Sequence, residues 1–273
     1  MKNKFLLYSI LGIISSSFFL FAYIQNNINM ALGNPNHAVA DTTVPENYLI
    51  EKLQYCLSYN NTKHLPNWVS WHVDSNDLGK KDRQNDFRSD VTLPVSWYHV
   101  TPADYKNTGF DKGHQCPSGD RTSSVANNSA TFLMTNMIPQ APKNNQITWK
   151  NLEDYSRSLV AKGNELYIIC GVYGQVGTGS KGAASTIGHG VLVPAKTWKI
   201  IVVLPVKDPT VTDSTRVIAV LMPNTQDCSR QPWYSYRVSV DFIEQLTGYD
   251  FLSNVPVDIQ KVLEAKTDNV PIR

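Results

Sequence analysis

Cysteine is scarce in this chain of 273 residues, and none of its four cysteines belongs to a Cys-x-x-Cys pair. That absence disfavours a zinc ribbon or a thioredoxin-like redox site. An oxidising environment would permit two disulfides among Cys56, Cys116, Cys170 and Cys228, in any of three pairings. Cys56 and Cys170 stand near apolar residues and could instead be small buried side chains, so we leave the pairing open.

An excess of one charge sign is also missing, because 25 lysines and arginines stand against 23 aspartates and glutamates. This balance argues against a broad polybasic surface, so a polyanion would have to be held by a local site. With 42% hydrophobic and 18% charged residues, the composition excludes a disordered, collagen-like or coiled-coil protein. Neither Gly-x-Ser-x-Gly nor His-Glu-x-x-His occurs, which weakens serine-hydrolase and metalloprotease hypotheses.

Long apolar runs are absent except at the N-terminus, where Lys2 and Lys4 precede an uncharged stretch over 5–24. A positive start followed by an apolar stretch is typical of an export signal. The stretch is long for a cleaved signal and just long enough to span a bilayer, so cleavage after Ala40 and retention as an anchor both stay open. In either case we expect the rest of the chain to lie outside the cytoplasm, secreted or periplasmic. We therefore expect a signal or anchor at 1–24, a linker at 25–46 and a folded domain at 47–273.

Strand and helix patterns are mixed in the remaining sequence without regular strand–helix alternation. This predicts an α+β fold with a mixed or antiparallel central sheet flanked by helices. A polar loop is expected over 74–94, and loops of that length in a compact domain are usually functional. Asp241 and Glu244 have the spacing of a helix capping box. Strands are expected at 68–73, 166–170, 198–204 and 216–222, and helices at 148–162, 241–247 and 256–266.

His114 has chemically suggestive neighbours. Asp111, Lys112 and Gly113 precede it, and Pro117 follows. The glycine permits close backbone approach, and the proline ends regular structure. On residue types alone a single histidine is more often structural than catalytic, and the other five histidines lack such neighbours.

A second pattern begins at Asn145, from which steps of four residues reach Trp149, Glu153 and Arg157. Such steps place side chains along one slowly drifting face of a helix. Taken alone, an amide, a carboxylate and a guanidinium aligned in this way more often form an ordinary solvated stripe of side-chain pairs.

Together these segments resemble a known family. The run 111–114 is similar to the Asp-Arg-Gly-His motif of the DNA/RNA non-specific endonucleases, the ββα-metal or His-Me finger nucleases. Asn136 and Gln140 match the family's Asn-x-x-Pro-Gln block, and Asn145, Glu153 and Arg157 match its Asn-x7-Glu-x3-Arg pattern. Flanking similarity runs from about residue 32 to residue 254. The resemblance implies the family's fold, including a ββα-metal motif at the active site.

The resemblance also implies a role for each matched residue. His114 would be the general base and Asn145 the direct ligand of Mg²⁺ or Mn²⁺. Glu153 lies eight residues after Asn145, about 12 Å along a helix, so we expect it to bind a metal-held water rather than the metal itself. Asn136 and Asp111 would orient these groups.

The resemblance assigns three cations to the phosphate. Arg83 would clamp it, although Arg88 nearby is a rival, and Arg157 would stabilise developing charge. Lys112 departs from the family, which usually has arginine at that position. The lysine keeps the positive charge but lacks the planar guanidinium group that can bind a phosphate through two hydrogen bonds. Trp149 is expected to pack rather than to stack on bases.

Groups that address phosphate and metal carry no base information. The resemblance therefore implies an exported, metal-dependent endonuclease that cuts DNA and RNA with little sequence preference. Two alternatives stay open: an inactive nucleic-acid-binding or uptake protein of the same fold, and a phosphodiesterase for small substrates. The sequence does not indicate whether a protein inhibitor exists, and membrane contact is expected only if residues 5–24 are retained. The 177–182 run spells Gly-x-Gly-x-x-Gly, but no convincing helix follows it, which argues against dinucleotide binding.

Overall fold

The computed structural model describes residues 27–272, so the expected signal or anchor segment, 1–24, lies outside the described residues. Within the described part of the chain, no helix is both long enough and apolar enough to cross a membrane.

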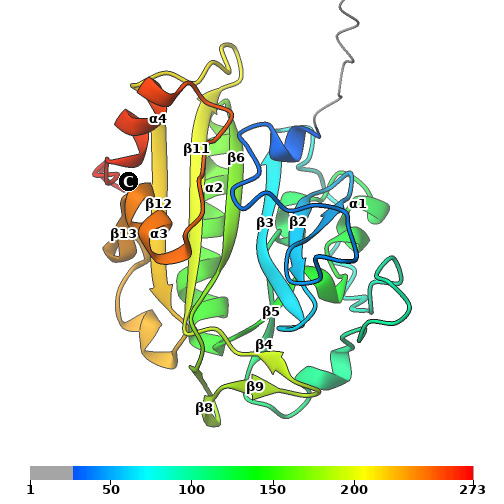
Figure 1. Ribbon diagram of the computed structural model, residues 1–273. Helices are drawn as coiled ribbons and strands as arrows, with labels where there is room; N and C mark the ends of the chain where they lie inside the picture. Colours follow the sequence, from blue (N-terminus) through cyan, green and yellow to red (C-terminus); the bar gives the residue numbers. More distant parts are fainter. Residues whose placement is uncertain (1–26, 273) are drawn as a thin grey trace, which may run out of the picture.

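A seven-stranded antiparallel sheet forms the centre of the molecule, in the order β1-β2-β3-β6-β11-β12-β13 (Figure 1). Its long strands contain the runs of β-branched and aromatic residues from which strands were expected. The expected α+β class is confirmed. The strands are β1 (Tyr48–Glu51), β2 (Cys56–Asn60), β3 (Leu65–Val73), β6 (Asn164–Tyr173), β11 (Lys196–Pro205), β12 (Arg216–Pro223) and β13 (Arg237–Val238).

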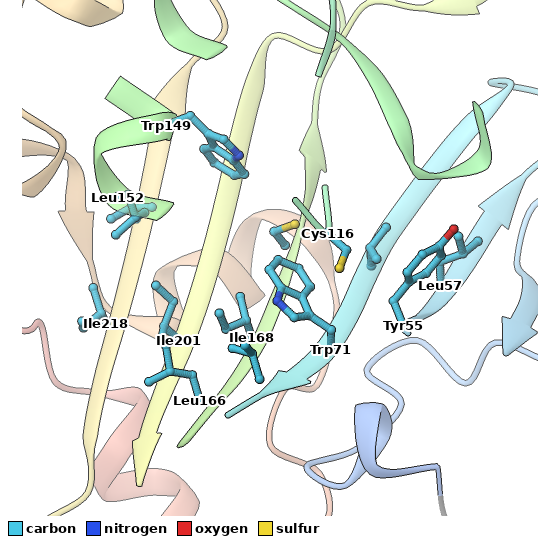
Figure 2. Close-up of a cluster of buried hydrophobic side chains, with 14 of the residues drawn as sticks. Tyr55, Leu57, Trp71, Cys116, Trp149, Leu152, Leu166, Ile168, Ile201 and Ile218 are labelled. Carbon is cyan, nitrogen blue, oxygen red and sulfur yellow. The ribbon is translucent and has the colours of Figure 1, made fainter. Parts of the chain in front are cut away.

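Both faces of the sheet are covered, which gives the molecule two apolar cores. Along β11, Ile201 points into one core while Ile200 and Val202 point into the other. The first core lies under helix α2 (Lys150–Ala161) and includes Trp71 and Trp149 (Figure 2). The second lies under α3 (Val240–Thr247) and α4 (Val257–Glu264). A strand buried on both sides explains why β11 reads as a continuous apolar run rather than an alternating one.

The helices agree with expectation in position but not in every cap. Helix α3 begins after Ser239, whose hydroxyl accepts a hydrogen bond from the amide of Phe242 at 3.2 Å. The predicted capping box from Asp241 to Glu244 is therefore wrong. Both of those residues lie inside the helix, because the serine two positions earlier already caps it. The helix ends at Gly248, whose positive φ of 72° suits a residue without a side chain.

Residues 27–46 are not the linker that their Asn, Gly and Pro content suggested. A short helical turn, η1 (Ile28–Met30), lies against β3, and Ala38 is buried in the second core. The side-chain oxygen of Asn29 accepts a hydrogen bond from the backbone amide of His72 at 3.1 Å. The segment is thus part of the folded domain, because Asn29 bonds to the backbone of β3 and Asn36 accepts a hydrogen bond from the indole of Trp68 at 2.8 Å.

A separate ββα unit lies beside the central sheet. Strand β4 (Asp111–His114) pairs antiparallel with β5 (Met137–Gln140), and the chain between them includes α1 (Val125–Ala130). After β5 the chain forms a π-helical turn, η5 (Asn144–Trp149), that runs directly into α2. The helix expected at 148–162 is therefore present, but its first turns are π-helical.

Short hairpins complete the fold. β7 (Gly177–Gly179) pairs with β8 (Gly182–Ala184), and β9 (Thr186–Ile187) pairs with β10 (Val191–Leu192). The Gly-x-Gly-x-x-Gly run is thus a hairpin with no helix after it, so the argument against dinucleotide binding holds. All four cysteines are buried with free thiols, so the alternative of small buried side chains holds and none of the permitted disulfides forms.

Candidate active site

Six of the eight predicted site residues line one hollow of about 340 Å³. The long loop contributes Arg83, β4 contributes Lys112 and His114, and the η5–α2 helix contributes Asn145, Glu153 and Arg157. The two others, Asp111 and Asn136, do not line the hollow. The remaining lining residues are Pro117, Ser118, Gly119, Gln146 and Lys150.

His114 ends strand β4 and is 7% exposed. Its imidazole lies against Phe87 and Phe132, with ring centroids 5.5 and 4.9 Å away. The Nε2 atom has no hydrogen-bond partner among the described residues. Burial, reinforced by the positive charges of Arg83 and Lys112, lowers the pKa of His114 to about 3. The ring is therefore neutral at physiological pH and can accept a proton.

The backbone on both sides of His114 is fixed by contacts with neighbouring residues. Gly113 lies so close to Gln140 of β5 that an added Cβ would approach the glutamine's Cβ to 2.6 Å. Asn136 is fully buried, and its amide bonds both the N–H and the C=O of Cys116, each at 2.9 Å. The chain on each side of His114 is thus held by close packing before the histidine and by a side-chain clamp after it.

Asn145 stands in the π-helical turn and is oriented by Asp111. Its Nδ2 donates to Asp111 Oδ2 at 2.8 Å, and Gln146 Nε2 donates to the same oxygen at 2.8 Å. This orientation leaves the amide oxygen of Asn145 available as an electron-pair donor in the hollow. Asp111 thus contacts one of the groups that the family resemblance expects it to orient.

Glu153 lies on the same helix, deeper in the site. Burial raises its pKa to about 7, although Lys199 and Arg157 pull in the opposite direction. Lys199 Nζ lies 3.9 Å from Glu153 Oε1 and 4.2 Å from the ring centroid of Trp149. Among the described residues, this long contact with Lys199 is the one ion pair of Glu153, and a bound divalent ion would add positive charge beside the carboxylate.

Two arginines border the hollow in fixed positions. Arg83 donates to Ser118 Oγ at 2.6 Å and lies 4.8 Å from the Phe132 ring centroid. Arg157 bonds Asp120 at 2.8 Å and Asp154 at 2.6 Å. Burial alone would lower the pKa of Arg157, but these acidic partners raise it above its usual value, so it stays charged. The planar guanidinium groups are held ready for an anion.

The structure also gives the positions of Arg88, the alternative to Arg83, and of Trp149. Arg88 pairs with Asp86 at 2.8 Å and does not line the hollow, so Arg83 is the arginine that reaches the site. Trp149 is 1% exposed and belongs to the apolar core, as expected of a packing residue. Lys112 lies 4.7 Å from the Phe87 ring centroid and lines the hollow.

Sequence reasoning missed two charged residues behind the site. Lys199 is 1% exposed in the middle of the apolar strand β11, and a lysine in such a run was the available signal. Asp120 is 2% exposed and bonds both Arg157 and the indole nitrogen of Trp71. Asp120 carried no such signal, because its partners are far away in the sequence.

The chain has relatives among known proteins. The family model for DNA/RNA non-specific endonucleases matches residues 32–258. A nuclease of Nostoc sp. is 50% identical over 246 residues, covering 89% of this chain and 87% of that protein. The mitochondrial nuclease EXOG of Danio rerio is 33% identical, covering 72% of this chain and 58% of that protein.

The fold has a solved counterpart. A structure of a complex between EndoG and EndoGI superposes with a TM-score of 0.70 at 23% identity, covering 84% of this chain and 91% of that one. At that identity the likeness concerns the fold alone. The sequence matches carry the assignment: the chain belongs to the DNA/RNA non-specific endonuclease family and is an endonuclease that hydrolyses the phosphodiester bonds of nucleic acids.

Proposed function

We propose that the protein cleaves DNA and RNA with little sequence preference, using His114 as general base and Mg²⁺ or Mn²⁺ held by Asn145. One observation carries the proposal. A neutral, buried imidazole with an unpartnered nitrogen lines the same hollow as an amide oxygen, a carboxylate and several cations. Hydrolysis of a phosphodiester requires these three functions together: a base, an electrophile and charge stabilisation.

The donor set fits a hard divalent ion. Asn145 offers its amide oxygen, because Asp111 accepts from the amide nitrogen, and Glu153 offers a buried carboxylate whose ion pair with Lys199 is long, at 3.9 Å. Oxygen donors of this kind suit Mg²⁺ and Mn²⁺, and Mg²⁺ keeps much of its water shell. When bound, the ion would supply positive charge to the phosphate and to the leaving oxygen. Asn145 would hold it directly and Glu153 through a bound water.

His114 Nε2 would take a proton from the attacking water. The nitrogen has no competing hydrogen bond, and the low pKa keeps it unprotonated across the neutral range. The same low pKa limits the driving force for proton transfer, so the base must be positioned well. The two phenylalanine rings and the clamp of Asn136 on Cys116 supply that positioning.

The cations would hold the phosphate. Arg83 and Arg157 are each fixed by hydrogen bonds that leave part of the guanidinium facing the hollow. Lys112 adds a point charge where the family's arginine would offer a fork. These groups address phosphate oxygens rather than base edges, which supports action on both DNA and RNA.

The experiment is a substrate panel with purified protein. Double- and single-stranded DNA, RNA and a chromogenic diester are incubated with Mg²⁺, with Mn²⁺ and with EDTA. We expect all three polymers to be cut with either metal and none with EDTA. Binding of DNA without cutting in both metals would indicate an inactive binding protein, and cleavage of the diester alone would indicate a small-substrate phosphodiesterase.

We further propose that the chain is exported by residues 1–24. The support is the sequence alone: two lysines, then an uncharged run of 20 residues. Fractionation of cells that express the full chain and a chain lacking 1–24 tests this. We expect nuclease activity outside the cytoplasm only with the full chain, and N-terminal sequencing would distinguish cleavage from anchoring. Equal cytoplasmic retention of both chains would contradict export.

A further inference from the structure

A second group of acidic side chains lies away from the hollow, where α3 and α4 meet. Asp241 and Glu244 stand one turn apart on α3, and Glu264 is the last residue of α4. One carboxylate oxygen from each lies within 4.8 Å of the other two. None of the three lines the catalytic hollow, and their helices cover the opposite face of the sheet from α2.

Glu264 distinguishes this group from an ordinary acidic surface. The residue is 6% exposed, and its Oε1 is buried without a hydrogen-bond partner. Leaving a buried carboxylate oxygen unsatisfied costs free energy, and buried polar atoms in proteins almost always have a partner. The carboxyl group of Glu264 instead has an oxygen within 4.8 Å of an oxygen of each of the two further carboxylates.

No basic side chain neutralises the group. Among residues 27–272, no lysine, arginine or histidine forms an ion pair with Asp241, Glu244 or Glu264. Burial, together with the charges of Glu244, Asp241 and Asp250, raises the pKa of Glu264 to about 8. The three carboxyl groups thus disfavour one another's ionised forms, and although Gln260 acts in the opposite direction on Glu264, no ion pair among the described residues offsets them.

We propose that Asp241, Glu244 and Glu264 form a second divalent-cation site, selective for Ca²⁺ and separate from the catalytic metal. The donors are carboxylate oxygens with no histidine or cysteine, which selects a hard cation. Three carboxylates suit Ca²⁺, which accepts several oxygen ligands in flexible geometry, whereas Mg²⁺ demands near-octahedral geometry and usually takes one or two carboxylates with water. The ion would give the buried Oε1 of Glu264 the partner that it lacks.

The position of the site indicates a structural role. Glu244 Oε1 also accepts a hydrogen bond from the amide of Phe251 at 2.7 Å, in the segment between the helices. A cation here would connect α3, that segment and the end of α4, and would hold them on the second core. We therefore expect the ion to change stability rather than turnover.

The test uses protein stripped of metal and carrying Asn145→Ala, so that the catalytic site does not contribute. Ca²⁺ is added in a calorimetric titration and in thermal melts. We expect one Ca²⁺ to bind and the Tm to rise by about 3 to 5 °C at ten times Kd. Adding Glu264→Gln should abolish both effects, and adding Asp241→Asn, at an exposed position, should weaken binding by at least about tenfold. The matched control Asp258→Asn, exposed at the start of α4, should leave both unchanged.

Three outcomes would overturn the proposal. The first is absence of Ca²⁺ binding in the Asn145→Ala protein. The second is binding that survives both Glu264→Gln and Asp241→Asn. The third is a Glu264→Gln protein that melts higher in EDTA while the parent shows no response to Ca²⁺, which would make Glu264 merely a buried, protonated acid.

Discussion

At the scale of single residues, the surroundings of two titratable groups in the hollow shift their pKa values in opposite directions. Burial and two neighbouring cations lower the pKa of His114 to about 3, whereas burial raises that of Glu153 to about 7. A lowered histidine and a raised glutamate in one site are the pattern expected where acid–base chemistry and metal binding are combined. The shifts also mean that both groups cost stability in their charged forms.

Glu153→Gln should raise stability at alkaline pH and remove activity. The pKa of about 7 in the folded state lies above the usual glutamate value of 4.5, so the folded state binds more protons than the unfolded state between those two pH values. The carboxyl's contribution is therefore fully favourable below pH 4.5 and is lost as pH rises through 7. We expect the metal-free variant to be about 1 to 3 kcal/mol more stable than the parent at pH 8, and equal to it near pH 4.

Denaturant unfolding in EDTA at the two pH values measures this, beside cleavage assays in Mg²⁺. A variant that is less stable than the parent at pH 8 would show that Lys199 fully compensates the buried carboxylate. A variant that keeps wild-type cleavage would remove Glu153 from the catalytic account.

At the scale of elements, the site depends on the junction of β4, β5 and the η5–α2 helix. The strand pair presents His114, and the helix presents Asn145, Glu153 and Arg157 along one face. Asp111, in β4, bonds Asn145 and so links strand to helix. The relative placement of His114 and Asn145 is thus set by the packing of these elements rather than by flexible loops.

Gly113→Ala should disturb this junction. The added methyl would lie 2.6 Å from Gln140 Cβ, so the two strands must separate. We expect a loss of about 1 to 3 kcal/mol in unfolding free energy, and a fall in kcat because His114 is the next residue. The control is Gly163→Ala at the end of α2, where φ is +89° but nothing lies within 4 Å. It should cost about 1 to 2 kcal/mol through its backbone conformation and leave kcat intact. Equal kcat for both variants would contradict the proposed role of the junction.

Helices and strands with a distinctive residue composition could be predicted from the sequence. The β-branched runs of β6, β11 and β12 and the apolar stripe of α2 appear where expected. The folded state of the asparagine-rich segment 27–46 and the cap of α3 could not be predicted. Asn29 bonds to His72, which is distant in sequence, and Ser239 rather than Asp241 caps the helix.

The candidate site divides in the same way. Its lining residues belong to compact motifs, so six of them could be named before their geometry was known. Lys199 and Asp120 act from beneath the site on groups 46 and 37 residues away in the chain, and only the folded sheet brings them there. The π-helical turn before α2 could not be predicted either, because the spacing of residues in the sequence does not distinguish a π-turn from an α-turn.

At the scale of the whole molecule, a nearly neutral chain gathers cations in one place. Four basic side chains line the hollow: Arg83, Lys112, Lys150 and Arg157. The overall charge is only +2, so affinity for nucleic acid must come from this local group rather than from a general basic surface. This predicts a moderate salt dependence of binding.

DNA affinity of the His114→Ala protein, measured without metal over a range of salt concentrations, tests this charge distribution. Two to four phosphate contacts predict a slope of log K against log salt of about −2 to −4. A flat line would mean that phosphates are not contacted. A slope steeper than about −6 would indicate a wider basic surface than the structure shows.

The central claim is that His114 removes a proton from water beside a divalent ion at Asn145. The most direct measurement is kcat for cleavage of double-stranded DNA in Mg²⁺ by the parent, by His114→Ala and by the control His99→Ala, whose histidine lies outside the hollow. We predict a loss of about 10²- to 10⁴-fold in kcat for His114→Ala, partial rescue by added imidazole, and no change for His99→Ala. Cleavage by the folded His114→Ala protein within tenfold of the parent, about 1.4 kcal/mol in barrier height, would contradict the account.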